Sequence, residues 1–169
     1  MSRIAFPMLI APFALLSSDH GSTEGMPKLN RPNDLNWKAG PPSLPPGAQI
    51  AVLEGDPGKP GPFVFRVKAP DGYRIPPHTH PKAERVTVIQ GTFKLGMGAS
   101  FDGSKMTTMP SGTYGMWPPG MKHFVEVKGE TIVQFHGDGP WVINYINPAD
   151  DPRGGSRTTD PNSHPATSD

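Results

Sequence analysis

Short apolar runs separated by turn residues dominate the middle of the chain. Several alternate apolar with polar positions, as a half-buried strand does, and residues 63–68 are an example, with Phe63, Phe65 and Val67 on one face. Strand-like runs bounded by Gly, Pro or Asp cover residues 49–53, 63–68, 84–90, 92–97, 113–117, 123–127, 131–136 and 141–146. Many short strands at close spacing predict a sandwich or a barrel.

Both ends of the chain lack this pattern. Residues 17–47 are rich in Pro, Gly, Ser and Asn, and only Leu35 and Trp37 are large apolar residues that we expect to dock onto a core. After Asn147 almost nothing apolar remains to offset the entropy of ordering. We therefore predict an arm over residues 22–47, a barrel over 48–147 and a flexible tail over 148–169.

The N-terminus carries a candidate export signal. Arg3 precedes an apolar stretch, residues 4–16, whose length suits the core of a signal peptide and is too short to cross a bilayer. We expect a signal peptide over residues 1–21 and a periplasmic or secreted protein with no membrane contact in its mature form. Pro7 and Pro12 interrupt the stretch and no clean cleavage pattern follows. The alternative is a cytoplasmic protein whose N-terminus packs on the fold.

Composition narrows the function classes. A chain of 169 residues fits one domain, and its 16 basic and 15 acidic side chains nearly cancel, which argues against nucleic-acid binding. Twenty glycines and 23 prolines disfavour long helices. Since there is no cysteine, disulfides, zinc-thiolate sites and thiol nucleophiles are excluded.

Candidate metal ligands cluster in residues 72–91. His78 and His80 are two apart, and side chains at i and i+2 of a strand share a face, so both imidazoles can approach one ion. Glu84 opens the next strand-like run on the face of Val86 and Val88. Burying this carboxylate alone would be costly, and a cation compensates it while the imidazoles supply nitrogen ligands. A His-x-His pair by itself is a weak signal, because two histidines on one strand face are often a hydrogen-bonded surface pair.

A second segment, residues 112–123, ends on His123 just after a Pro-Gly turn that aims it. The two segments resemble the paired motifs of the cupin superfamily, G-x5-H-x-H-x3-E-x6-G and G-x5-P-x-G-x2-H-x3-N. The matching residues are Gly72, His78, His80, Glu84, Gly91, Gly112, Pro118, Gly120 and His123, and Val127 replaces the family's asparagine. The resemblance implies an all-β cupin barrel (a double-stranded β-helix, or jelly roll) with one divalent metal ion on His78, His80, Glu84 and His123. A cupin with an empty site is the alternative.

Residue types around this cluster suggest further roles. Three imidazoles and a carboxylate suit Mn, Fe, Co, Ni, Cu or Zn alike. Glu84 doubles as a candidate base, and His136 is a candidate proton shuttle if it shares the cavity face with Gln134, or else a rim histidine. Candidate pocket residues, each with an ordinary core or surface role as the alternative, are Arg66, Arg74, Lys94, Met97, Tyr114, Trp117 and Trp141.

Three functions remain open. We expect a metal-dependent oxidoreductase, most simply a dioxygenase that acts on a small organic molecule. The alternatives are a non-catalytic metal- or ligand-sensing module, and a metal-dependent isomerase, lyase or decarboxylase. Because the edges of an open barrel need protection, we also expect a homodimer.

Overall fold

The computed structural model describes residues 26–154. Nearly all regular structure in this part is β-strand. The strands are β1 (Lys38–Ala39), β2 (Gln49–Glu54), β3 (Gly61–Ala69), β4 (Arg74–Thr79), β5 (Glu84–Met97), β6 (Met106–Pro110), β7 (Tyr114–Trp117), β8 (His123–Gly139) and β9 (Asn144–Tyr145). This part also contains four single-turn helices: η1 (Pro32–Asp34), η2 (Gly103–Lys105), η3 (Pro148–Asp150) and η4 (Pro152–Gly154). None of these helices is long or apolar enough to cross a membrane.

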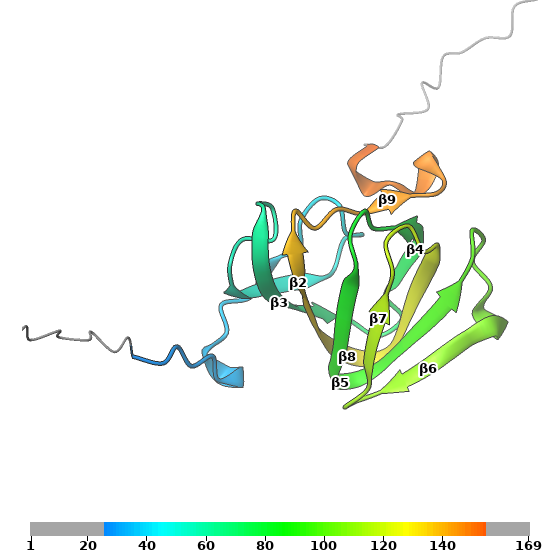
Figure 1. Ribbon diagram of the computed structural model, residues 1–169. Coiled ribbons are helices and arrows are strands. Elements are labelled where there is room, and N and C mark those ends of the chain that lie inside the picture. The colour runs from blue at the N-terminus through cyan, green and yellow to red at the C-terminus, as the bar shows by residue number, and fades with distance from the viewer. Residues whose placement is uncertain (1–25, 155–169) are drawn as a thin grey trace, which may run out of the picture.

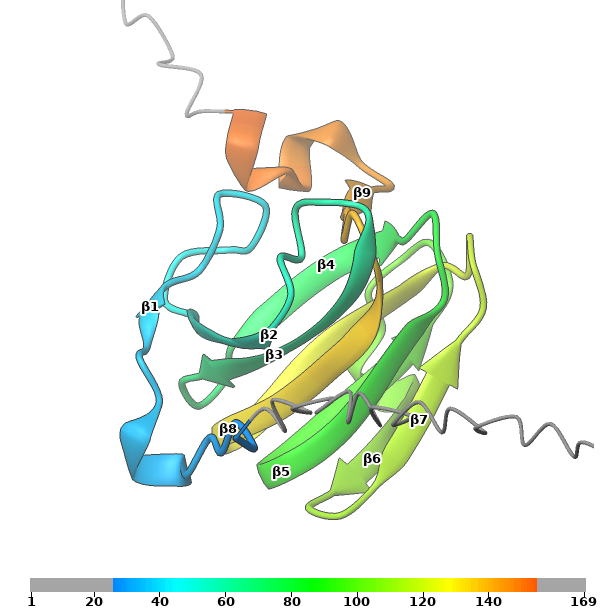
Figure 2. The ribbon, with the colours of Figure 1, turned by 60° about the vertical axis from the view of Figure 1, so that its left-hand side comes forward.

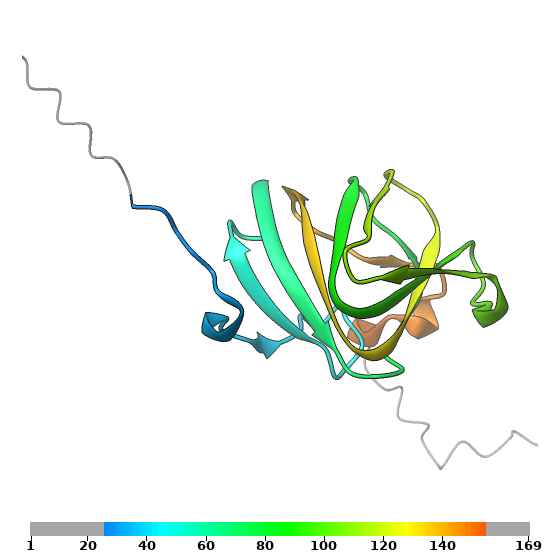
Figure 3. The same cartoon turned by 90° about the horizontal axis from the view of Figure 1, so that it is seen from below.

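One antiparallel sheet curls around a central core, as Figures 1 and 3 show. The strand order is β1-β2-β3-β8-β4-β9, and β5 pairs with β6, β7 and β8. Figure 2 shows the long strand β8 between β3 and β5, the two strands with which it pairs over most of its length. The all-β barrel predicted from the sequence is therefore confirmed.

Alternating side chains build the interior of the barrel. On β3, Phe63, Phe65 and Val67 are buried while Arg66 and Lys68 are half-buried on the other face, as the sequence pattern predicts. Val86 on β5 is completely buried. The rings of Phe65 and Phe63 stack with centroids 5.3 Å apart. The interior is thus an apolar core, and any polar group inside it needs a specific partner.

The strand boundaries differ from those expected in several places. Residues 84–90 and 92–97 form one strand, β5, and residues 123–127 and 131–136 form another, β8, each continuing through a glycine that we expected to end it. Strands β4 and β6 were not predicted, because Pro76, Pro77 and Pro110 resemble strand breakers. Of residues 141–146, only Asn144 and Tyr145 are in a strand.

The described part of the arm packs on the barrel through more contacts than expected. Leu35 and Trp37 are half-buried, and Lys68 lies over the Trp37 ring at 4.8 Å. The arm's core residue is Leu44, which is 4% exposed and which the sequence analysis overlooked. The Tyr73 hydroxyl donates to the Pro45 carbonyl at 2.7 Å. The arm is therefore part of the folded domain.

The predicted tail begins with ordered residues. Pro148–Asp150 and Pro152–Gly154 form η3 and η4, and the Arg153 guanidinium donates to the Ile143 carbonyl at 2.9 Å. The remaining tail, residues 155–169, and the candidate signal peptide, residues 1–21, lie outside the described residues. Both stay predictions.

Candidate metal centre

Four polar side chains meet inside the barrel near one of its ends. His78 lies on β4, His80 directly follows that strand, Glu84 begins β5 and His123 begins β8. Their exposed fractions lie between 1 and 6%. The turn before β8 is tied to the first segment, because the Gly120 N–H donates to the His80 carbonyl at 2.9 Å. Gly120 has φ of 75°, which favours glycine, so the Pro-Gly turn has a direct structural reason.

Each of the three imidazoles is fixed by one ring nitrogen. Nδ1 of His78 is 2.7 Å from the Pro76 carbonyl, Nδ1 of His80 is 2.7 Å from the Val142 carbonyl, and Nδ1 of His123 is 3.1 Å from the Met121 carbonyl. A carbonyl oxygen only accepts hydrogen bonds, so Nδ1 carries the proton and Nε2 of each neutral ring keeps its lone pair. Nε2 of His80 and of His123 are buried without a hydrogen-bond partner. Buried acceptors of this kind are poised for a cation.

The distances fit a shared ion. One ligand atom each from His78, His80 and His123 lies within 4.8 Å of the others. Two nitrogens bound to one ion at about 2.1 Å, at octahedral or tetrahedral angles, lie roughly 3.0–3.4 Å apart, so the widest separation in the set would have to close by less than about 2 Å. Glu84 Oε1 lies 3.3 Å from His80 Nε2, and Oε2 lies 3.7 Å from His123 Nε2. The three imidazoles could hold a metal ion, with the carboxylate beside them.

The electrostatics favour neutral histidines and an ionised acid. Burial, together with His123 and His80, lowers the pKa of His78 to about 3. Burial also lowers the pKa of His80, against the attraction of Glu84. Burial raises the pKa of Glu84, but positive charge on His80 or His123, together with the Trp141 N–H, outweighs burial and lowers the pKa to about 2. At neutral pH His78 and His80 are therefore uncharged nitrogen ligands, and Glu84 supplies one negative charge.

A small cavity of about 30 Å³ adjoins the cluster. Apart from the cluster itself its walls are mostly apolar and include Val67, Phe93, Val133 and Phe135. One water needs roughly 10–15 Å³ measured in this way, so the cavity has room for about two molecules of that size. Anything larger would reach the cluster only after lining side chains move.

Trp141 is the pocket candidate that lines this cavity. Its Nε1–H donates to Glu84 Oε1 at 2.9 Å, and its ring stacks on His80 with centroids 5.6 Å apart. Sequence reasoning named Trp141 but missed its contact with the acid, because the two residues are 57 positions apart and nothing local links them. The Val142 carbonyl that holds His80 was also missed, since a backbone acceptor has no sequence signature.

His136 lies on the outer face of β8. Its neighbour Phe135 is buried in the core, and its cross-strand partners are Val64 and Arg85. Its ring stacks with that of Tyr114, which is 57% exposed, at a centroid distance of 6.2 Å. The condition for a shuttle, that His136 faces the cavity, is not met here. In the sequence, the apolar residues Val133 and Phe135 already indicated which side chains of this strand point inward, and His136 is out of phase with them.

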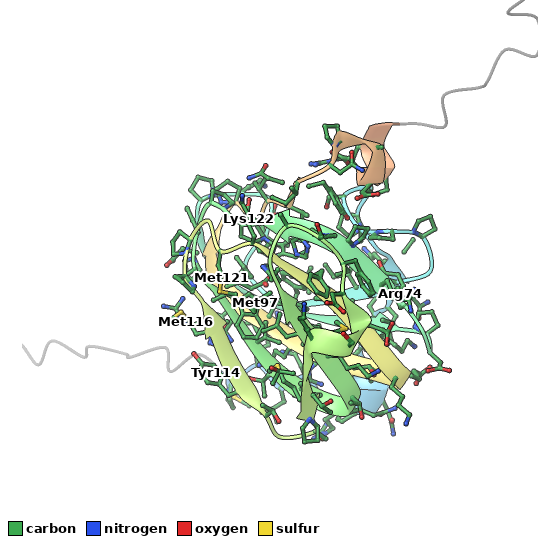
Figure 4. All side chains as sticks on the ribbon, turned by 90° about the vertical axis from the view of Figure 1, so that its right-hand side faces the viewer. Arg74, Met97, Tyr114, Met116, Met121 and Lys122 are labelled. Carbon is green, nitrogen blue, oxygen red and sulfur yellow. The ribbon has the colours of Figure 1, made fainter. Side chains whose placement is uncertain are left out.

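The remaining pocket candidates do not line the cavity. Arg66 donates to Gln134, and Lys94 and Arg74 both pair with Glu126. In Figure 4, Tyr114 and Met116 lie at the left of the molecule, Met97 nearer the middle and Arg74 at the right. Trp117 is buried but does not line the cavity. Its ring packs so closely over Gly115 that a Cβ added to this glycine would lie 2.3 Å from the ring.

Comparisons with solved structures agree with this fold. The polyketide cyclase RemF of Streptomyces resistomycificus has a TM-score of 0.58 and 16% identity, covering 76% of this chain and 91% of that one. A putative acetylacetone dioxygenase of Methylibium petroleiphilum PM1 has a TM-score of 0.56 and 16% identity, covering 77% and 88%. An RmlC-like cupin of Shewanella frigidimarina NCIMB 400 has a TM-score of 0.50 and 12% identity, covering 67% and 91%. At these identities the likeness concerns the fold alone.

Sequence comparisons are more specific. Germin-like protein 5-1 of Oryza sativa subsp. japonica is 33% identical over 90 residues, which cover 53% of this chain and 40% of that protein. The match thus spans less than half the length of this relative. Residues 27–142, which include all four polar residues of the cluster, match the ChrR cupin-like domain. The chain therefore belongs to the ChrR cupin-like domain family, within the cupin superfamily.

Proposed function

We propose that this protein is a metal-dependent oxidoreductase of the dioxygenase type that acts on a small organic molecule. The observation that carries the proposal is the meeting of three buried imidazoles and an ionised carboxylate at an apolar cavity. When bound, a redox-active divalent ion supplies an electron donor and a Lewis acid. The dioxygenase named among the structures of similar fold is consistent with this reaction class.

The side chains of the protein have three tasks in this function. His78, His80 and His123 present Nε2, with Nδ1 anchored on backbone carbonyls. Glu84 supplies the negative charge that offsets part of the charge of a divalent ion. With its pKa held at about 2, Glu84 is better suited to remain an ionised ligand than to act as a general base, whose pKa should lie near the working pH.

The cavity selects what enters beside the ion. Its apolar walls exclude bulk water, and its volume of about 30 Å³ admits dioxygen or about two waters. A larger substrate would react at the mouth, or would enter after side chains such as Trp141 move. Exclusion of water strengthens every electrostatic contact inside the site.

Oxygen consumption tests the proposal. The apo-protein is loaded separately with Fe(II), Mn(II), Ni(II) and Cu(II), and each form is mixed with a panel of phenols, thiols and enols. We expect oxygen uptake above that of the same metal salt without protein in at least one pairing, and no such excess when both His78 and His80 are replaced by alanine. If every form leaves the oxygen concentration unchanged with every compound, the oxidoreductase proposal is wrong.

A second function, metal sensing without catalysis, is favoured by the same small cavity. Ligand pockets for organic molecules commonly measure roughly 300–1,000 Å³, far more than the space here. Four protein groups closing around zinc would leave no position for a substrate. Metal analysis of protein isolated from its host separates the two: four-coordinate zinc indicates sensing, and an open redox ion indicates catalysis.

A further inference from the structure

The segment between β8 and β9 contacts the candidate metal centre twice. Trp141 donates its Nε1–H to Glu84 Oε1 at 2.9 Å, and the next residue, Val142, accepts from His80 Nδ1 at 2.7 Å. The segment is itself held, because the Trp141 backbone N–H donates to the Pro57 carbonyl at 2.7 Å and Ile143 is completely buried. Neither cupin motif includes these residues. Two of the four polar groups therefore depend on a third part of the chain.

Aromatic packing fixes the direction of the Trp141 N–H. The indole stacks on His80 with an interplanar angle of 23°, and it meets Phe65 edge-on at 5.1 Å and Phe135 at 5.9 Å. Rings held from several sides lose little further freedom when they make a hydrogen bond. The Trp141 N–H therefore points at one oxygen of the Glu84 carboxylate, which is itself buried.

We propose that Trp141 is a positioning residue of the metal centre: its N–H holds Glu84 by Oε1 and fixes the carboxylate beside the imidazoles of His80 and His123. The inference rests on the metal binding in the proposed function. A hydrogen bond from a neutral N–H occupies one lone pair of Oε1 and restrains rotation of the carboxylate. Without it, Glu84 is free to turn both oxygens toward the ion or to move away.

The second buried tryptophan near the cluster supplies a matched control. Trp117 lies 6.1 Å from His123 between ring centroids and is 6% exposed, but its Nε1 has no hydrogen-bond partner. Replacing Trp117 with phenylalanine removes an indole N–H from the same core without removing a hydrogen bond to the cluster. A difference between the two variants therefore reports the contact with Glu84 rather than the loss of an indole.

The test measures Co(II) affinity by competition with a chelator, in the full chain. We expect Trp141→Phe to weaken Co(II) binding about tenfold or more, in the range usual for groups that support metal ligands, and to alter the visible Co(II) spectrum as the ligation by Glu84 changes. Trp117→Phe should leave both unchanged. Thermal unfolding checks that each variant folds, and Trp141→Leu replaces Trp141→Phe if the latter does not.

A double-mutant cycle identifies the path of the effect. In a Glu84→Ala background, Trp141→Phe should cause no further loss of affinity, because the contact is already gone. An equal loss in both backgrounds, or no loss in the wild type, overturns the positioning role. Wild-type protein that binds no Co(II) overturns the metal centre together with this role. If Co(II) binds as expected but no oxygen is consumed in the earlier experiment, only the oxidoreductase proposal fails.

Discussion

Histidines inside and outside the barrel differ in how their ring nitrogens are held. Each inner ring, those of His78, His80 and His123, has Nδ1 on a backbone carbonyl and directs Nε2 toward the cluster. His136 has a buried Nδ1 without a partner, and its ring stacks on Tyr114 at the outer face. Both kinds of histidine lie on or beside strands. What distinguishes a candidate ligand is an anchored second nitrogen, and this feature follows from the fold rather than from the residue type.

The strongest loss of metal binding is expected when two of the inner histidines are removed. Replacing both His78 and His80 with alanine should lower the affinity for Zn(II) or Co(II) more than 100-fold, about 3 kcal/mol, because two nitrogen ligands are lost from a site that has one carboxylate besides His123. His136→Ala should leave the affinity unchanged. Metal content after dialysis, measured by mass spectrometry, checks both. Unchanged metal content in the double variant would contradict the assignment of the inner histidines.

The inner cluster was predictable because its signals are local motifs. His78 and His80 alternate with Thr79, Glu84 shares its phase with Val86, and the match to the paired cupin motifs joined these residues to His123. His136 could have been placed outside from Phe135 beside it, whose burial fixes the phase of β8. The candidate residues were chosen by residue type, and residue type does not indicate which face of a strand a side chain lies on.

Other parts of the fold could not be predicted for physical reasons. Strand β4 contains Pro76 and Pro77, and the proline pair hides the strand that carries His78. Gly91 resembles a turn, yet it lies inside β5, where φ of 76° and a Thr131 oxygen 2.4 Å from an added Cβ require glycine. The contact of Trp141 with Glu84 joins residues far apart in sequence. Such pairs are set by how the sheet closes.

The burial of the inner histidines should also make the stability of the metal-free protein depend on pH. In the apo-protein the pKa of His78 is held near 3, whereas an unfolded histidine titrates near 6.5. Between these values the unfolded chain binds the proton and the folded chain does not, so the free energy of unfolding should decrease as the pH falls from 6.5. The expected slope is about 1 kcal/mol per pH unit for this residue. Urea unfolding of metal-free protein between pH 7 and pH 5 measures it.

The control for this experiment removes the titrating group. In the His78→Gln variant, the free energy of unfolding should decrease less as the pH falls, by the contribution of one histidine. The decrease that remains should include the contribution of His80, whose pKa burial also lowers. If wild-type and His78→Gln proteins lose stability equally as the pH falls, the inner ring is not kept neutral by the fold. The anchored nitrogen would then not distinguish it from an outer histidine.

The least change is expected for charged residues of the outer face that the sequence analysis named as candidate pocket residues. Lys94 Nζ lies 2.9 Å from Glu126 Oε1, and Arg74 lies 2.6 Å from the other oxygen of the same acid. Since Arg74 is largely exposed and Glu126 keeps Arg74 as a partner, Lys94→Ala should change the free energy of unfolding by less than about 1 kcal/mol. It should leave metal affinity unchanged, because Lys94 does not line the cavity. A loss of metal affinity in this variant, measured beside Trp141→Phe, would mean that the outer network reaches the cluster and that the two faces of the barrel are not independent.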